Sequence, residues 1–554
     1  MPTIEVSHQD LCKFIGKKIS IPQLELDLPY AKCELKEKEG DLLKIEVADT
    51  NRPDLWGPEG IARELKGHYG IQTGLPPFKT YPSKCILHMD KAVLSYRPYV
   101  SCAIVKNCHI TDQGIKDMIQ WQEKLAETFG RKRSEVSIGI YDYDKITWPM
   151  RFVMADPDKT KFIPLEFREE MTLRQILSRH PKGQQYGHLL QNLKRYPIFI
   201  DSANDILSMP PIINSNHTGK VTHETKNLFI EATGRTWKTV HTALLILAAN
   251  FHDQGCRIET VTIQNPKKKV VTPDFAPQKT TLSLDYLNQL SGLGLSKDQA
   301  VKLLKKARYQ PKITGKNIVV QYPAYRQDLL HPADVVEDVL VQYGFNNIKP
   351  EYPQLVTTGK LQPIEELSHH VANILVGLGG QEVLSYTLTN KEFLFQHMNL
   401  EVQPHIEIDN AVSKNWSIFR TWVLPSVMEF LNRNKMREYP QQVFEIGEVV
   451  LPDAKAETRT VNPTRLCWAK ICNDADYTQA KQVLEYLLGQ LGLEYTIEEV
   501  QHTSFIPGRV GRVVVKGKNV AYIGEVHPQV LENWNLEMPV CAFELNLTDL
   551  MGLL

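Results

Sequence analysis

Residues 325–338 read Tyr325-Arg326-Gln327-Asp328-Leu329-Leu330-His331-Pro332-Ala333-Asp334-Val335-Val336-Glu337-Asp338, the sharpest local pattern in the chain. A helix is expected from about Ala333 to Tyr343, because Gly344 is a typical residue to end it. Three acidic residues then stand at positions i, i+3 and i+4 and share one helix face, with Cβ atoms about 5–6 Å apart. They are Asp334, Glu337 and Asp338. Like charges at this spacing repel one another and disfavour the helix.

Two interpretations of this acidic face stay open. A hard divalent cation such as Mg²⁺ or Ca²⁺ takes carboxylate oxygens and would relieve the repulsion, with Asp328 in the preceding loop as a fourth ligand. Alternatively, Asp334 interacts favourably with the N-terminal end of the helix, and Glu337 and Asp338 are simply solvated. The pattern therefore gives a candidate metal site at Asp328, Asp334, Glu337 and Asp338.

Working outward from this stretch, the sequence divides into four segments and predicts an α+β multidomain protein. Strand-like and helical stretches are interleaved in residues 1–84 and 85–268, and residues 272–350 hold two helices, a strand and the acidic helix. Residues 355–554 mix helices with strands, which suggests an antiparallel sheet with helices packed on it. At roughly 100–200 residues per domain, the chain is long enough for three to five domains. No tandem repeat is visible.

A second candidate site lies in residues 210–218 and 225–234. Small polar residues cluster there beside apolar, strand-like ones, and such a mixture suits a pocket that hydrogen-bonds a small polar ligand. Glu231, on an otherwise apolar strand, is a candidate for holding an ammonium group. A surface loop beside an edge-strand glutamate is the alternative interpretation.

Composition excludes several classes of protein. The 64 Lys and Arg residues equal the 64 Asp and Glu residues, so global charge does not indicate a nucleic-acid binder. Any RNA contact must come from local patches such as Arg131-Lys132-Arg133 or Lys267-Lys268-Lys269, each of which is otherwise a solvated loop. The nine cysteines contain no Cys-x-x-Cys pair and fit a reducing cytosol. The longest apolar run, Ala243 to Ala249, is far below the ~20 residues that span a bilayer.

The chain also lacks the sequence signatures of nucleotide sites and of common catalytic nucleophiles. There is no phosphate-binding Gly-x-x-x-x-Gly-Lys loop, no dinucleotide Gly-x-Gly-x-x-Gly after a strand, no Gly-x-Ser-x-Gly and no His-Glu-x-x-His. A chain of this length without such a signature is expected to be either a scaffold or one part of a larger enzyme.

Several stretches, taken in order, resemble the beta subunit of phenylalanine–tRNA ligase, of the archaeal and eukaryotic cytosolic type. The resemblance runs nearly from end to end. It rests on these stretches: Asp49-Thr50-Asn51-Arg52-Pro53-Asp54-Leu55-Trp56, Pro210 to Ser215, Thr225 to Glu231, Tyr325 to Asp338, Phe444-Glu445-Ile446-Gly447-Glu448, Pro507-Gly508-Arg509 and Gly524-Glu525-Val526-His527-Pro528. Each stretch is weak evidence alone, and their shared order makes the resemblance specific.

The resemblance implies a role for each segment. Residues 85–268 look like a tRNA editing domain, and residues 272–350 look like a winged-helix-like module with magnesium at Asp328, Asp334, Glu337 and Asp338. Residues 355–554 resemble a class II synthetase core without its catalytic motifs. ATP, phenylalanine and the ligation step then belong to an alpha subunit, in a cytoplasmic (αβ)₂ heterotetramer that charges tRNA(Phe). The alternative is a stand-alone tRNA-editing protein or RNA-binding scaffold without a ligase partner.

The editing role has a physical reason. A phenylalanine pocket rejects tyrosine poorly, because tyrosine merely adds a hydroxyl, so a second site that engages the hydroxyl can remove the error. We expect Glu231 to hold the substrate ammonium and Asn214, Ser215 and His217 to line the pocket. Members of the family often read Thr-Gly-Thr-Asp just after this glutamate, whereas this chain has Thr233-Gly234-Arg235-Thr236.

Overall fold

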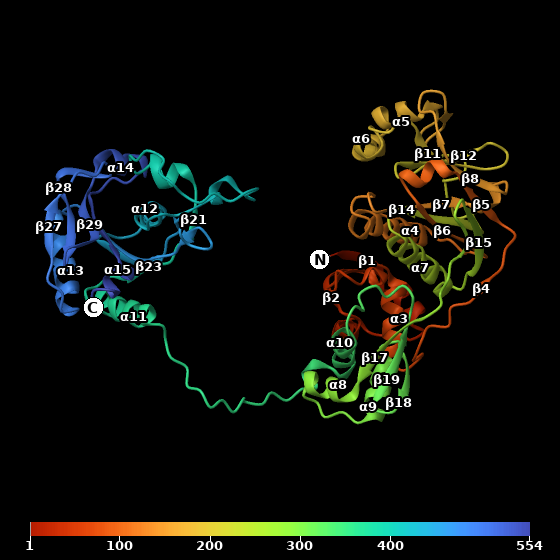
Figure 1. The fold of residues 1–554 in the computed structure, drawn as a ribbon, viewed down its shortest axis with the longest axis horizontal. Helices are drawn as coiled ribbons and strands as arrows, with labels where there is room; N and C mark the ends of the chain where they lie inside the picture. The colour runs from red at the N-terminus through yellow and green to blue at the C-terminus, as the bar shows by residue number, and fades with distance from the viewer. Residues whose placement is uncertain (1) are drawn as a thin grey trace. The chain divides into compact units, whose positions relative to one another are not determined.

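The computed structural model describes residues 2–554, which form two compact units. One unit runs to Tyr352 and the other from Pro353 to Leu554. Both mix helices with β-sheets, as the sequence predicts (Figure 1). No helix in this described part of the chain combines the length and the apolar character needed to cross a membrane.

The first unit begins with a small module of three antiparallel strands in the order β1-β3-β2. Its elements are β1 (Thr3–Ser7), α1 (His8–Ile15), α2 (Ile21–Asp27), the short 3₁₀ helix η1 (Leu28–Ala31), β2 (Cys33–Glu39), β3 (Leu42–Val47) and α3 (Pro58–His68). Alternate residues of β1 and β3, among them Ile4, Val6, Leu43 and Ile45, are fully buried, which is the period of a strand with one face on the core.

The first unit ends with a second module of the same topology, again with the first strand beside the third (Figure 1). Its elements are β17 (Gln278–Ser283), α8 (Leu284–Ser291), α9 (Lys297–Lys306), β18 (Gln310–Thr314), β19 (Asn317–Tyr322) and α10 (Pro332–Tyr343), and its strand order is β17-β19-β18. The acidic helix expected from the sequence is therefore confirmed as α10.

The two modules also use the same local signals at matching positions. Ser7 and Ser283 cap the N-termini of α1 and α8, where each side chain accepts the backbone N–H of the residue three positions later. Gly16 and Gly292, both in the left-handed conformation, end these two helices. A proline stands at the start of both α3 and α10, where its missing N–H costs nothing. The chain therefore contains a duplicated module. A search for tandem repeats misses it because more than two hundred residues separate the copies.

The modules pack on each other through matching elements, α3 against α9 and α10 against η1. Gln342 Nε2 of α10 donates to the Tyr30 carbonyl of η1 at 3.0 Å. On the matching side, Gly67 of α3 lies so close to the end of α9 that a Cβ there would stand 2.1 Å from the Lys306 carbonyl oxygen. The interface is thus approximately reciprocal.

The residues between the two modules in the sequence form an eleven-stranded sheet. Its main order is β13-β12-β11-β8-β5-β15-β6-β14-β7, with β4 and β16 also on β15. The strands are β4 (Thr80–Tyr81), β5 (Ile86–Met89), β6 (Tyr99–Lys106), β7 (Val136–Asp142), β8 (Met150–Ala155), β11 (Tyr196–Ile200), β12 (Ile206–Met209), β13 (Ile213–Asn214), β14 (Leu228–Gly234), β15 (Arg257–Asn265) and β16 (Lys268–Thr272). The sheet extends beyond the predicted segment 85–268 at both ends, because β4 and β16 pair with β15.

Helix α7 (Trp237–Asp253) packs on β6 and β14 of this sheet, and its residues from Val240 to Phe251 are almost all buried. Helix α4 (Asp112–Lys124) contributes Met118 and Trp121 to the same core. The short helices α5 (Leu173–Arg179) and α6 (Pro181–Tyr186) belong to a separate core with β11. The apolar run at 243–249 is thus a buried helix, as its length predicts.

The second unit is built on a seven-stranded sheet of order β20-β23-β26-β30-β29-β28-β27, antiparallel except where β20 pairs with β23. Helices α11 (Pro363–Gly377), α13 (Tyr477–Gln490) and α15 (Leu547–Met551) cover one face, and α12 (Leu424–Arg433) and α14 (Pro528–Asn533) cover the other. The strands are β20 (Gln381–Glu382), β23 (Gln441–Glu448), β26 (Thr464–Ile471), β27 (Thr496–Glu499), β28 (Phe505–Val515), β29 (Lys518–Val526) and β30 (Val540–Asn546). The predicted sheet with packed helices is confirmed.

Substituting Gly67 by alanine tests the packing between the modules. The added methyl group meets the Lys306 carbonyl oxygen, so we expect Gly67→Ala to lower the stability of the chain by about 1–3 kcal/mol. Thermal unfolding of the full-length chain measures the loss. The control is Gly489→Ala at an exposed position of α13, where nothing lies within 4 Å of the added Cβ and alanine favours the helix. An unchanged Tm for Gly67→Ala would contradict the close approach.

Candidate functional site

The large sheet buries a glutamate on β14, the strand next to its edge strand β7. Glu231 lies on β14 between β6 and β7, facing Cys102 and Gly139 across the ladders, and only 2% of the residue is exposed. Its Oε1 accepts a hydrogen bond from the Tyr141 hydroxyl at 3.1 Å, and that hydroxyl also lies 2.7 Å from the Ser208 hydroxyl. Gly139 leaves room for this pair, since a Cβ there would stand 2.6 Å from Glu231 Oε1.

The second carboxylate oxygen of Glu231 is buried and has no hydrogen-bond partner among the described residues. Burial raises the pKa of Glu231 to about 8, and the Tyr141 hydrogen bond and the Arg97 charge only partly oppose this effect. A buried acceptor without a partner is costly unless something supplies a donor. Glu231 is therefore prepared to receive a hydrogen-bond donor, above all a cationic one.

Glu231 lines a cavity of about 400 Å³. The volume is in the range of small-molecule sites, which combine apolar walls with a few placed polar groups. The lining residues include Glu231, helix α4, strand β7 and the loop that carries the Pro210-Pro211 dipeptide: Ile115, Met118, Ile119, Gln122, Glu123, Arg133, Ser137, Ile138, Ile140, Leu165, Glu166, His180, Lys182, Pro210, Pro211, Ile212, Ile213, Asn214, Asn216, Gly219, Lys220, Val221 and Glu231.

The structure brings together only some of the residues expected in this pocket. Asn214 lines the cavity with Glu231, and its Nδ2 donates to the Ile140 carbonyl at 3.2 Å. Ser215 is buried behind the wall, 2.9 Å from the Thr218 hydroxyl, and supports the loop. His217 is exposed and does not line the cavity. The sequence of a polar loop does not indicate where a histidine side chain lies. For Glu231, in contrast, the apolar residues of its strand indicate that the position is buried.

The departure at Arg235-Thr236 leaves the cavity wall unchanged, because both residues are exposed and neither lines it. Sequence reasoning missed Tyr141 and Ser208, which meet Glu231 only through the sheet. Ser208 lies 23 positions before Glu231 and Tyr141 lies 90 positions before it. The two-residue period of a strand predicts which face of the strand Tyr141 occupies, but it does not predict which residue of a neighbouring strand lies beside it.

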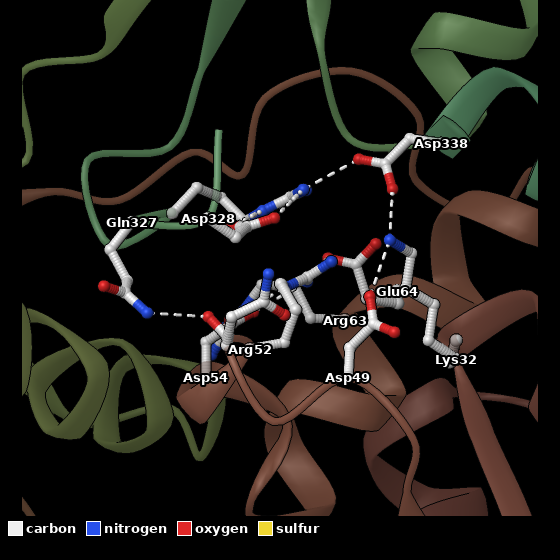
Figure 2. A network of polar contacts seen from close by, with 12 residues as sticks. Lys32, Asp49, Arg52, Asp54, Arg63, Glu64, Gln327, Asp328 and Asp338 are labelled. Atoms are coloured by element: carbon white, nitrogen blue, oxygen red, sulfur yellow. Dashed lines mark hydrogen bonds and ion pairs between the residues drawn. The ribbon is translucent and has the colours of Figure 1, made fainter. Parts of the chain in front are cut away.

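Three of the four carboxylates expected at the metal site pair with cations of the chain itself, and Figure 2 shows Asp328 and Asp338 among them. Arg326 donates to both oxygens of Asp328, at 2.8 and 2.7 Å, and to Asp338 at 2.7 Å. Lys32 of the first module lies 3.0 Å from Asp338 and 3.1 Å from Glu337. Burial by itself raises the pKa of Asp338, but Arg326 and Lys32 outweigh burial and hold that pKa well below its usual range.

Asp334 has a different role from its neighbours on α10. Its carboxylate accepts the backbone N–H groups of Leu330 and His331, both at 2.7 Å, and so forms part of a capping box at the start of the helix. Asp334 therefore stabilises the N-terminus of the helix, as the second interpretation expects. The same interpretation expects Glu337 and Asp338 to be solvated. Glu337 is exposed, but Asp338 is buried.

The first module contains a matching arrangement at Arg52 (Figure 2). Arg52 donates to both oxygens of Asp54, at 2.9 and 2.8 Å, and to Glu64 on α3 at 3.1 Å. In both modules the arginine binds the acid two residues ahead in bidentate fashion and a helical acid twelve residues ahead. We call each set an arginine clasp: Arg52, Asp54 and Glu64 in one, Arg326, Asp328 and Asp338 in the other.

The four expected ligands do not fit a magnesium site as the chain arranges them. Two belong to an arginine clasp, one caps a helix, and Glu337 points to Lys32. Among residues 2–554, no group of three or more His, Cys, Asp or Glu side chains is placed to hold a metal ion. Magnesium at Asp328, Asp334, Glu337 and Asp338 stays a prediction.

Two protein-family profiles place the chain in the tRNA synthetase class. The profile described as "tRNA synthetase B5 domain" matches residues 280–345, the second module. The profile described as "Phenylalanyl tRNA synthetase beta chain CLM domain" matches residues 348–547.

Curated relatives cover the whole chain. The phenylalanine–tRNA ligase beta subunit of Pyrococcus horikoshii is 44% identical over 99% of this chain and 100% of its own length. The beta subunits of Pyrococcus furiosus and Methanothrix thermoacetophila are 43% and 34% identical, also over 99% of this chain and 100% of their own lengths. A crystal structure of an N-terminal fragment of the Pyrococcus horikoshii subunit covers 62% of this chain and 100% of the fragment, with 42% identity and a TM-score of 0.61. The chain belongs to the family of phenylalanine–tRNA ligase beta subunits.

Replacing Asp338 by asparagine tests whether this carboxylate pairs with Arg326 and Lys32 or binds a magnesium ion. Arg326 and Lys32 would lose a buried anion, and breaking a buried ion pair costs about 3–5 kcal/mol. We expect the same fall in Tm for Asp338→Asn in magnesium and in chelator. Glu337→Gln is the control, because its exposed ion pair contributes at most about 1 kcal/mol. A larger loss in magnesium than in chelator would support a bound ion instead.

Replacing Glu231 by glutamine tests its raised pKa. The unfolded glutamate loses its proton near pH 4.5 and the folded one near pH 8, so wild-type stability falls as pH rises between these values. Glu231→Gln lacks this cost. We expect its stability advantage over the wild type to grow from pH 4.5 to pH 8, to a few kcal/mol at about 1.4 kcal/mol per pKa unit, and then to level off. Denaturant unfolding measures it, with exposed Glu224→Gln as the control. A difference independent of pH would exclude the raised pKa.

Proposed function

We propose that the chain supports ATP-dependent attachment of phenylalanine to tRNA(Phe) with an alpha subunit, and that its large-sheet domain hydrolyses tyrosine mischarged onto that tRNA. The observation that carries the editing role is Glu231 itself, which lines a cavity of about 400 Å³ and whose Oε2 has no hydrogen-bond partner among the described residues. Relatives named as beta subunits support the partnership, and the lack of nucleotide signatures in the sequence supports an ATP site on the alpha chain.

In this proposal Glu231 binds the ammonium group of the aminoacyl ester. An ammonium ion beside the carboxyl favours the ionised form, so binding lowers the raised pKa and the complex forms with a carboxylate. The Tyr141 hydroxyl fixes Oε1, which leaves Oε2 to face the ligand. Asn214 and the apolar walls from Ile138 and Ile140 then hold the rest of the aminoacyl group and exclude solvent.

The partner assignment follows the same family. We propose an (αβ)₂ heterotetramer in which the alpha chain binds ATP and phenylalanine and this chain contributes editing and part of the frame. Magnesium accompanies ATP in the charging reaction, and no residue role in this chain depends on it here. Mixing the full-length chain with its alpha subunit and assaying ATP-dependent charging tests this assignment. Charging by the alpha subunit alone at the full rate would contradict it.

Deacylation of tyrosyl-tRNA(Phe) by the αβ complex tests the editing role. Glu231→Ala removes the acceptor for the ammonium group, so we expect at least about a tenfold loss, which corresponds to 1.4 kcal/mol for one charged hydrogen bond. Phenylalanine charging should be unchanged, because the ligation site lies elsewhere. His217→Ala is the matched control, since this histidine is polar, close in sequence to the pocket, and exposed outside it. Deacylation by Glu231→Ala at the wild-type rate would contradict the assignment of Glu231 to the editing site.

A further inference from the structure

Helix α4 forms one wall of the cavity. Its residues that line the cavity are spaced three and four apart, which places them on one face of the helix. They are Ile115, Met118, Ile119, Gln122 and Glu123. Strand β7 lines the same cavity through Ser137, Ile138 and Ile140. The width of the cavity on this side therefore depends on the distance between α4 and β7.

Two glutamines attach α4 to the edges of two different sheets. β7 is the edge strand of the large sheet, and Gln122 Nε2 donates to its Ile138 carbonyl at 2.7 Å. β1 is an edge strand of the first module, and Gln120 bonds both backbone groups of Glu5 on it. Gln120 Oε1 accepts the Glu5 N–H at 2.8 Å, and Nε2 donates to the Glu5 carbonyl at 3.0 Å. Residues two positions apart do not share a helix face, so α4 lies between the two edges.

The face of α4 toward the first module is also packed against it. Trp121 is 1% exposed and lies in one hydrophobic core with residues of β1 and α3. Gly57, directly before α3, is so close to the indole that a Cβ there would stand 2.3 Å from Trp121 Nε1. Gly57 has a φ of −160°, an extended conformation that any residue adopts. The glycine is therefore required by this contact and not by its own backbone.

The two faces of α4 differ in how much support they receive. A short helix is stabilised mainly by tertiary packing of its faces. One face of α4 borders the open cavity, apart from the single bond of Gln122 to β7. The other face holds Gln120 on β1 and Trp121, whose ring also meets Phe251 of α7 edge-on at 5.6 Å. The position of α4 is therefore set largely from the side away from the cavity.

We propose that the first module positions the α4 wall of the cavity, with Gln120 and Trp121 as positioning residues that set the distance between α4 and β7. This inference rests on the proposed editing function and adds to it a role for the first module, none of whose residues lines the cavity. A displaced wall changes how well the cavity fits the aminoacyl group and leaves the ester chemistry to other residues. The effect of a change at these contacts is therefore expected in KM more than in kcat.

Substituting Gly57 by alanine shifts the wall without touching the cavity. The added methyl group meets the buried indole of Trp121, so α4 must move. Deacylation of tyrosyl-tRNA(Phe) by the αβ complex measures the result. We expect KM to rise at least about fivefold, the lower end of the effect of overpacking a core, with kcat changed less. Phenylalanine charging should be unchanged.

Replacing Trp121 by phenylalanine in the Gly57→Ala background is the rescue variant. Phenylalanine lacks the pyrrole ring, whose Nε1 and Cδ1 would stand 2.3 and 2.8 Å from the added Cβ. We expect the double variant to return KM to the value of Trp121→Phe alone. Gln120→Met keeps the length of the side chain and loses both bonds to Glu5, so KM should rise about threefold. Gln120→Glu, which keeps only the acceptor, should lie between Gln120→Met and the wild type.

Gly67→Ala is the matched control, because it makes the same substitution in the first module at a contact with Lys306 instead of α4. It should lower Tm and leave KM for tyrosyl-tRNA(Phe) unchanged. Equal rises of KM in Gly57→Ala and Gly67→Ala would overturn the proposal, since a general loss of stability would then explain both. An unchanged KM in Gly57→Ala would overturn it as well.

Hydrogen exchange tests the support of α4 without any substrate. If the wild-type complex does not hydrolyse tyrosyl-tRNA(Phe), the proposed function fails, and exchange of the backbone amides of residues 115–124 still tests the wall. We expect Gly57→Ala to speed this exchange at least about fivefold more than Gly67→Ala does, because local opening of α4 becomes easier. Equal exchange in the wild-type complex and in Gly57→Ala would overturn the inference whatever the hydrolysis assay shows.

Discussion

A guanidinium group buried between two carboxylates holds the first unit together. Arg326 is shared by Asp328 and Asp338, and Lys32 from the other module completes the charge balance around Asp338. Buried ions cost several kcal/mol of desolvation each and are tolerated only where hydrogen bonds use nearly all of their donors and acceptors. Because that condition needs both modules in place, the clasp and Lys32 favour the packing of one module on the other.

The duplication explains how a carboxylate cluster can look like a metal site. In the first module the same geometry, Arg52 with Asp54 and Glu64, joins a loop to a helix. The second copy keeps the clasp and has Asp334 and Glu337 where the first module has Gly60 and Arg63. Spacing alone shows four acids near one another. The cations that pair with three of them are Arg326 and Lys32, and Lys32 lies 306 positions before Asp338.

The cavity follows a related physical rule in its charges. Glu231 is buried, and its Oε2 has no hydrogen-bond partner within the described residues. In the clasps each buried arginine meets carboxylates inside the fold, whereas this carboxyl keeps one oxygen without a partner. In the proposed editing function, that oxygen receives the substrate.

The sequence by itself determined the α+β class, the helix that begins at Pro332, the buried helix around 243–249 and the strand with Glu231. It also determined the family, because the family's short motifs occur in order along the chain. These depend on neighbours within a few positions, where period and capping act. Tertiary structure alone decided which charges are paired, as where Arg326 and Lys32 bind Asp338. It also decided that His217 is exposed outside the cavity and that Tyr141 donates to Glu231. The reason is that a side chain's charge partner and direction depend on residues brought close by folding, and their separation in the sequence, up to 306 positions for Lys32 and Asp338, carries no local signal.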